Sequence, residues 1–331
     1  MKAVKVPLNQ LNDVRKVFME KGLMNLDYKI KAEDDYGYIP VNNDVDGYEV
    51  CDVNLEPLKR YPRNFTDFLD GVLTAEESEE LKTSFDIIGD VVIVEIPEKL
   101  KDKKSEIGDA TLKFTKRKSV FMKKSAIHGT TRIRDLELIA GEDNSETIHK
   151  EHGVRFQLDV KNVYFSPRLA TERKRVSDSV CENENILDMF CGIGPFPIII
   201  AKYNNVNVTA VDINGVAIDY LDKNIKLNKL QGKITPICSD INKVSFNQKF
   251  DRIIMNLPGL AYTFLDLAID LINDEGIINY YEFADTFGTG IERLQKAASK
   301  KNKKVEILNT RKVKSSSPGM WHVAIDAKIT E

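Results

Sequence analysis

The second half of the chain alternates short strands rich in β-branched residues with amphipathic helices, and this alternation constrains the fold more than any other feature. The pattern predicts strands at 186–190, 207–212, 233–237, 251–255 and 276–282, with helices at 195–203, 216–228, 261–272 and 285–300. Strands alternating with helices are typical of a doubly wound parallel sheet with helices on both faces. We therefore expect an α/β domain over residues 168–331.

The last two predicted strands, at 304–312 and 320–329, have no helix between them, only a turn over 315–319. A parallel pair needs a long crossover, so these two strands must pair antiparallel. Five parallel strands closed by such a hairpin form a Rossmann-like sheet with an antiparallel terminal strand. This is the class I methyltransferase arrangement rather than a plain dinucleotide-binding fold.

A glycine loop follows the first predicted strand, at the carboxyl edge where doubly wound sheets bind their ligands. The strand ends in Asp188, and Phe190, Gly192 and Gly194 follow. A dinucleotide fingerprint would need a third glycine where Pro197 stands, which disfavours an oxidoreductase that binds pyrophosphate. The loop instead fits the methyl donor S-adenosylmethionine, and we expect these four residues to bind it.

Three later strand ends carry polar side chains suited to this donor and to an acceptor base. Asp212 can accept both ribose hydroxyls of an adenosine, and Asp240 would then lie beside the adenine. A helix N-cap and a plain loop aspartate are the respective alternatives. Asn256 offers a donor and an acceptor to the edge of a planar base, while Pro258 stiffens the loop. We expect Asn256 to face both donor and acceptor.

Two smaller α+β domains are predicted upstream, at 1–62 and 65–167. In the first, a strand is followed by a helix that places Leu11, Val14, Val17 and Phe18 on one face, and a hairpin surrounds the turn at 34–37. The clearest elements of the second are paired strands over 86–96, a helix at 98–114, and strands at 119–122 and 155–160. Both domains precede the methyltransferase sheet.

The net charge of −3 conceals a segregation of charge along the chain. Lys and Arg predominate at 98–134 and 296–314, whereas Asp and Glu predominate at 31–86. Arginines also alternate with aromatic residues at 164–173. Basic surfaces facing RNA and ordinary solvated helix surfaces both explain this pattern, and charge alone does not separate them.

Composition excludes several other classes. The four cysteines are far apart and form no CxxC pair, so we expect neither a disulfide framework nor a metal site. No stretch approaches the roughly 18 uninterrupted apolar residues of a membrane span, and the N-terminus has no apolar signal core. We therefore expect a cytoplasmic protein without a membrane partner.

Five segments resemble, in order, the archaeal and eukaryotic tRNA (guanine-37-N1)-methyltransferases: 132–142, 147–153, 164–169, 188–196 and 256–258. The resemblance covers nearly the whole chain. It implies three domains, the first of which contacts the outer corner of the tRNA. It also implies a monomer that transfers a methyl group from S-adenosylmethionine to N1 of guanosine 37 in the anticodon loop.

The same resemblance implies roles for individual residues. Glu172 would remove the N1 proton, which guanine keeps at neutral pH, and Arg132 would stabilise the charge that develops on O6. Asn256 would hold the flipped base beside the methyl group. The tRNA would be contacted by Arg132, Tyr164, Arg168, Arg173 and Pro258. Base flipping costs little in an anticodon loop because its bases are unpaired.

Three alternatives stay open at this point. One is an aminocarboxypropyl transferase of wybutosine synthesis, which uses the same donor, and another is a methyltransferase specific for a different RNA base. The Asn256 to Pro258 triplet and Glu172 favour methyl transfer to guanine. The third is an RNA-binding module with a vestigial donor site, against which the intact Asp188, Gly192, Gly194 and Asp212 argue.

Overall fold

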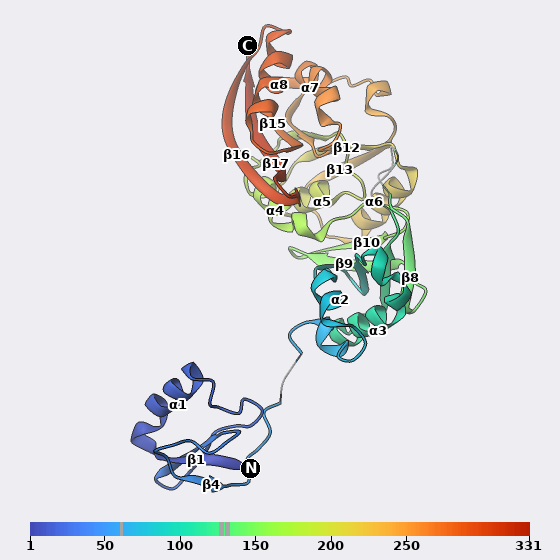
Figure 1. Cartoon of the computed structure of the whole chain (residues 1–331). Helices are drawn as coiled ribbons and strands as arrows, with labels where there is room; N and C mark the ends of the chain where they lie inside the picture. Colours follow the sequence, from blue (N-terminus) through green and yellow to red (C-terminus); the bar gives the residue numbers. More distant parts are fainter. Residues whose placement is uncertain (60–61, 126–128, 130–132) are drawn as a thin grey trace. The chain divides into compact units, whose positions relative to one another are not determined.

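The computed structural model describes residues 1–59, 62–125, 129 and 133–331. The chain divides into two compact units, Met1–Arg63 and Asn64–Glu331 (Figure 1). In the described part of the chain, no helix is both long and apolar enough to cross a membrane.

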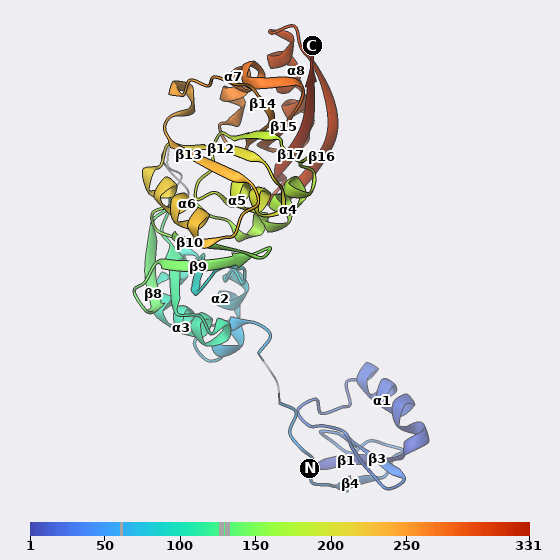
Figure 2. The same ribbon diagram turned by 180° about the vertical axis from the view of Figure 1, so that it is seen from behind.

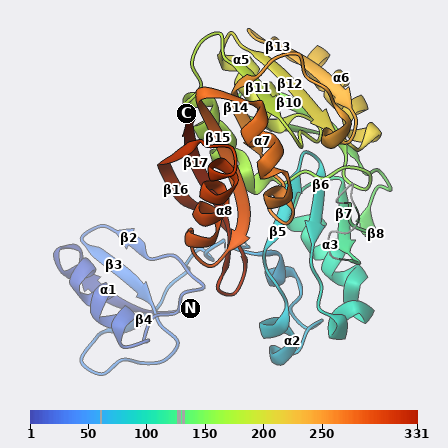
Figure 3. The ribbon, with the colours of Figure 1, turned by 90° about the horizontal axis from the view of Figure 1, so that it is seen from above.

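The first unit is a four-stranded antiparallel sheet with one helix on it. Its strand order is β2 (Lys31–Glu33), β3 (Tyr36–Pro40), β1 (Lys2–Pro7) and β4 (Val50–Asp52). Helix α1 (Leu11–Glu20) lies beside β1 and β3 (Figure 3). Val14 and Phe18 of α1 are buried, as the helical spacing predicts. Val17 was expected on the same face but is exposed, because it lies at the edge of the apolar stripe formed by Val14 and Phe18.

The second unit begins with a mixed four-stranded sheet. Its order is β5 (Phe85–Ile88), β6 (Val91–Val94), β7 (Ser119–Lys123) and β8 (Leu136–Gly141). Only β6 and β7 are parallel, and their crossover runs through η3 (Glu98–Lys103) and α3 (Lys104–Thr115). Short helices η2 (Phe65–Phe68) and α2 (Ala75–Glu80) precede the sheet (Figure 2). The sequence did not predict them.

A two-stranded hairpin, β9 (Glu146–Glu151) with β10 (Val154–Asp159), follows this sheet. Its Phe156 and Leu158 are fully buried in one core with Phe196 and Ile199 of α5 (Pro195–Tyr203). The hairpin therefore belongs to the hydrophobic core on which the larger sheet depends.

The larger sheet has seven strands in the order β13-β12-β11-β14-β15-β17-β16. The bounds are β11 Asn185–Asp188, β12 Asn207–Asp212, β13 Lys233–Cys238, β14 Phe250–Met255, β15 Ile272–Ala284, β16 Lys304–Ser317 and β17 Met320–Thr330. The first five in this order are parallel, and β17 runs antiparallel between β15 and β16. The predicted parallel sheet with an antiparallel terminal hairpin is confirmed.

Helices cover both faces of this sheet, because alternate strand residues point to opposite sides. On one face, Ile186 of β11 packs with α5 and α6 (Gly215–Leu227). Helix α4 (Ala170–Asp178) contacts α5. Leu187, the neighbour of Ile186, packs in a second core with α7 (Leu265–Leu271) and α8 (Gly288–Ser299). The helix predicted at 261–272 is a 3-10 turn, η6 (Ala261–Phe264), followed by the shorter α7.

Asn224 of α6 ties the β9–β10 hairpin to the sheet. Its side chain is fully buried, accepts a hydrogen bond from Gln157 N at 2.7 Å, and donates to Gln157 O at 3.1 Å and Ile193 O at 3.2 Å.

We predict that Asn224→Ala lowers the free energy of unfolding by about 1–3 kcal/mol, because buried backbone groups lose their partners. Urea unfolding measures this loss, with the exposed Asn205→Ala as control. Equal stability of the two variants would contradict the assignment.

Candidate methyl-donor and base-binding site

The loop after β11 contains two glycines with different structural tasks. Gly192 and Gly194 both have positive φ, 54° and 84°. A Cβ on Gly194 would lie 2.3 Å from Cδ1 of Leu221, so this glycine lets α5 approach α6. A Cβ on Gly192 would meet nothing closer than Tyr164 O at 3.9 Å. Gly192 therefore leaves open space, and it lines a cavity of about 380 Å³.

This cavity lies at the carboxyl ends of the parallel strands and brings most of the predicted site residues together. The predicted residues that line it are Tyr164, Arg173, Phe190, Gly192, Asp212, Asp240, Asn256 and Pro258. Asp188, Gly194, Arg168 and Glu172 are not among the lining residues. Arg132 lies outside the described residues.

Asp212 connects the ends of β11 and β12. Its Oδ2 accepts a hydrogen bond from Gly192 N at 2.7 Å, and its Oδ1 accepts one from Asn214 N at 2.8 Å. The N-cap of α6 is Asn214, whose side chain accepts from Val216 N, so Asp212 does not serve as the cap. A carboxylate has about four lone-pair sites, so Asp212, which lines the cavity, keeps acceptor capacity beyond the bonds to its own loop. Burial raises the pKa of Asp212.

Asp188 stabilises the glycine loop after β11 through a hydrogen bond to its backbone. It is 1% exposed, and its Oδ1 accepts from Phe190 N at 3.2 Å. Phe190 in turn packs edge-on against Phe264, with ring centroids 5.0 Å apart, and both rings line the cavity. On the far side Asp240 caps η5 (Ile241–Lys243) by accepting from Asn242 N at 3.0 Å.

The acceptor half of the cavity begins at Asn256, directly after β14. In the described part of the chain, Oδ1 of Asn256 is buried and has no hydrogen-bond partner. An unpaired buried amide oxygen costs free energy, so its presence beside a cavity indicates a bound group that donates to it. Phe283 N donates to Pro258 O at 3.1 Å and thereby attaches the loop to β15.

Two residues of the terminal strands complete this half and were not found from the sequence. Lys314 of β16 lines the cavity and donates to Ser166 Oγ at 3.3 Å. His322 of β17 is opposite Phe283 of β15 in the sheet register, and both line the cavity. No motif or spacing marks either residue, because they reach the site only through the antiparallel pairing.

Arg173 and Arg168 both form ion pairs within the protein. Arg173 is 1% exposed and binds the Glu151 carboxylate with two hydrogen bonds of 2.7 and 2.5 Å, while also donating to Ser166 O. This pair fastens α4 to β9. Arg168 Nε lies 2.5 Å from Asp86 Oδ1, beside a smaller cavity of about 290 Å³.

The smaller cavity shares Tyr164 and Lys314 with the first and also contains Lys123, Arg134 and Arg168. Burial and the neighbouring guanidinium groups lower the pKa of Lys123. Asp86 and Glu95 line the same cavity and pair with Arg168 and Lys123, but the cations outnumber them. An excess of cations suits an anionic ligand such as a phosphate.

Glu172 lies in α4 and does not line the cavity. Its Oε1 accepts a hydrogen bond from Tyr281 OH at 2.8 Å. Tyr281 is fully buried and contacts the rings of Phe196 and His322, which line the cavity. Burial and then the Glu172 charge raise the pKa of Tyr281, which keeps its hydroxyl a donor.

The sheet order and the cavity at its carboxyl edge define a class I methyltransferase. The donor S-adenosylmethionine fits the residues present. Gly192 offers backbone without a side chain, Asp212 offers free acceptor sites for ribose hydroxyls, and Asn256 offers an unsatisfied oxygen at the opposite end.

Comparisons with known proteins agree with this class. Residues 147–308 match the family model of the TRM5/TYW2 methyltransferase domain, 65–144 the TYW2 N-terminal domain and 3–49 the tRNA methyltransferase 5 N-terminal domain. The chain is 46% identical to the tRNA (guanine(37)-N(1))-methyltransferase Trm5b of Pyrococcus abyssi over 99% of both chains. It is 40% identical to Trm5b of Methanocaldococcus jannaschii over 96% of this chain and 95% of that protein.

Solved structures give the same result. The crystal structure of Trm5b from Pyrococcus abyssi superposes with a TM-score of 0.82 at 45% identity over 100% of both chains. A complex of aTrm5 with tRNALeu has a TM-score of 0.77 at 37% identity over 99% of both chains. Methanocaldococcus jannaschii TYW2 with AdoMet scores 0.60 at 33% identity, covering 75% of this chain and 100% of that one. The chain belongs to the TRM5/TYW2 methyltransferase family and uses S-adenosylmethionine.

Asp188 makes the stability of the protein depend on pH. Burial raises its pKa to about 8, and the Asp212 charge adds to this effect. The unfolded carboxyl titrates near its ordinary value of about 3.9, so between these values the folded chain binds more protons. The contribution of Asp188 to stability is therefore complete below about pH 4 and is lost as pH rises toward 8.

We predict that Asp188→Asn loses less stability than the wild type between about pH 5 and about pH 8, because the amide does not titrate. Urea unfolding at the two pH values gives the difference. The exposed Asp219→Asn on α6 serves as control and should follow the wild type. Parallel loss of stability in all three proteins would show that Asp188 does not titrate in this range.

Proposed function

We propose that this protein transfers a methyl group from S-adenosylmethionine to N1 of guanosine 37 in the anticodon loop of tRNA. The observation that carries the proposal is the buried, unpaired Oδ1 of Asn256, at the boundary between the donor and acceptor halves of the cavity. Two relatives with full-length similarity carry this activity in their names, and a relative's structure contains tRNALeu.

The donor supplies an electrophilic methyl group on a sulfonium. In the proposed arrangement Asp212 accepts the ribose hydroxyls, Asp240 lies beside the adenine, and Phe190 and Gly192 form the wall and floor. Asp188 and Gly194 act indirectly, since one braces the loop and the other lets the helices pack. The loop is therefore preorganised for the donor.

On the acceptor side Asn256 aligns the guanine edge, and Glu172 takes the N1 proton as the N1–methyl bond forms. The bond between the methyl group and the donor's sulfur breaks in the same step and leaves a neutral thioether. Arg132 stabilises the negative charge that develops on O6. The Glu172 carboxylate lies behind Tyr281, whose ring contacts Phe196 and His322 of the cavity wall. The proposal therefore includes a local opening of this wall when the base binds.

For the tRNA we propose contacts by Tyr164, Arg168 and Pro258, with Arg173 acting through its clamp on Glu151. The predicted first domain, at 1–62, would contact the outer corner of a tRNA bound to one monomer. The divisions at 65–167 and 168–331 are part of the same proposal, as is a cytoplasmic location, where tRNA substrates are present.

The function is tested by incubating the purified chain with S-adenosylmethionine and tRNA transcripts that carry G37 or A37. Nucleoside mass spectrometry should find 1-methylguanosine from the G37 transcript alone. With tRNA that carries 4-demethylwyosine at position 37, an aminocarboxypropyl adduct would instead identify the activity named for another relative, which is 40% identical over 73% of this chain. Equal modification of A37 would contradict recognition of guanine N1.

For the base, we predict that Glu172→Gln keeps donor and tRNA affinity but lowers the single-turnover rate at neutral pH by about 10²–10⁴-fold. The amide keeps the size of the side chain and cannot accept the proton. Exposed Glu182→Gln is the matched control. A rate near that of the wild type in Glu172→Gln would exclude this residue as the base.

A further inference from the structure

The Glu172 carboxylate is surrounded by donors from three elements. Arg175, one helical turn along α4, donates to Oε1 from Nη2 at 2.7 Å and to Oε2 from Nε at 3.1 Å. Tyr281 of β15 also donates to Oε1, and Nε of Arg311 on β16 lies 3.4 Å from Oε2. A carboxylate that is 1% exposed needs such partners to stay ionised.

Arg175 is itself held from its other side. Its Nη1 donates to Asp326 Oδ2 at 2.5 Å and its Nη2 to Asp326 Oδ1 at 3.1 Å. Burial alone lowers the pKa of Arg175, but the hydrogen bonds to Glu172 and Asp326 outweigh it and raise that pKa. The guanidinium is thus fixed between two carboxylates, one on its own helix and one on β17.

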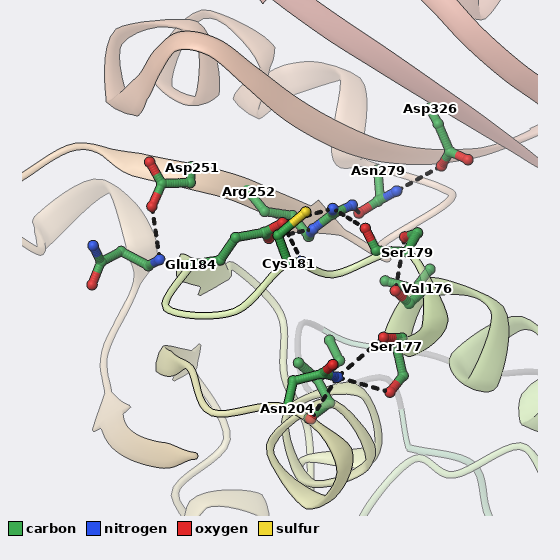
Figure 4. A network of polar contacts seen from close by, with 12 residues as sticks. Val176, Ser177, Ser179, Cys181, Glu184, Asn204, Asp251, Arg252, Asn279 and Asp326 are labelled. Atoms are coloured by element: carbon green, nitrogen blue, oxygen red, sulfur yellow. Dashed lines mark hydrogen bonds and ion pairs between the residues drawn. The ribbon is translucent and has the colours of Figure 1, made fainter. Parts of the chain in front are cut away.

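Beyond Asp326 the polar network continues through a neutral side chain. Asn279 Nδ2 donates to Asp326 Oδ1 at 2.6 Å, and Asn279 Oδ1 accepts from Arg252 at 3.2 Å (Figure 4). Arg252 makes two hydrogen bonds to Glu184, of 2.8 and 3.1 Å. The uncharged amide separates this second ion pair from the three charges next to the site.

We propose that Arg175 and Asp326 are positioning residues for the Glu172 carboxylate, with Asp326 acting through Arg175. This inference rests on the proposed role of Glu172 as the base. Arg175 orients both carboxylate oxygens and favours the ionised form, which is the form that accepts a proton. Asp326 prevents Arg175 from turning away and, as an anion, partly offsets its charge.

Substitution of Arg175 and substitution of Asp326 should shift the pH dependence of the methylation rate in opposite directions. Arg175→Gln removes a cation from Glu172, so protonation becomes easier and the acid-side fall of the single-turnover rate should move to higher pH by about one unit. Asp326→Asn removes an anion while its amide oxygen can still accept from Arg175 and hold it, so the fall should move to lower pH. Two other groups facing Glu172, Tyr281 and Arg311, are unchanged in both variants, and so is His322 behind Tyr281.

The experiment measures single-turnover methylation of tRNA against pH with the full chain, together with donor affinity and melting temperature. Arg175→Lys should recover part of the rate lost in Arg175→Gln, because it keeps the charge but not the planar fork. Glu184→Gln breaks a bidentate arginine pair at the far end of the network. It should lower the melting temperature and leave the pH profile of the wild type unchanged.

Opposite displacement of the two profiles supports the inference. Unchanged profiles, or displacement of both in one direction with a parallel fall in melting temperature, would reduce Arg175 and Asp326 to structural residues. Glu172→Gln separates this result from failure of the proposed function. If that variant loses its rate while the other two keep the wild-type profile, only the positioning role is overturned.

Discussion

The hydrogen bond from Gly192 N to Asp212 Oδ2 is the interaction on which the site depends. It joins the carboxyl ends of two adjacent parallel strands, β11 and β12, at the place where the glycine leaves open space. This bond fixes the position of the Asp212 side chain, and Asn214, not Asp212, caps α6. The bond is part-buried, which limits competition from water and favours one shape of the loop.

The parallel part of the fold follows from local sequence, since strand and helix periods alternate from β11 to α8, except between β13 and β14, where only the 3-10 turn η5 intervenes. The donor half of the site follows too, because Gly192, Asp212 and Asn256 each stand at the end of a predicted strand or within two residues of it. His322 and Lys314 could not be found in this way. They reach the cavity through the pairing of β17 with β15 and β16, a long-range register that no local pattern encodes.

The terminal hairpin therefore does more than close the sheet. From one strand, β17, His322 reaches the cavity wall and Asp326 reaches Arg175 behind it. Glu172 was predicted from the family resemblance, but its surroundings were not, because its partners Tyr281 and Arg311 come from distant strands. The ion pairs that fix the proposed base are thus a product of the tertiary fold.

The central claim is that Glu172 and Asn256 meet one guanine edge beside the transferred methyl group. A crystal structure of the full chain with tRNA carrying G37 and a non-transferable donor analogue tests it most directly. We expect guanine N1 within hydrogen-bond distance of the Glu172 carboxylate, with a guanine N–H donating to Asn256 Oδ1. A flipped base bound in the cavity while Tyr281 and His322 still separate it from Glu172 would contradict the account.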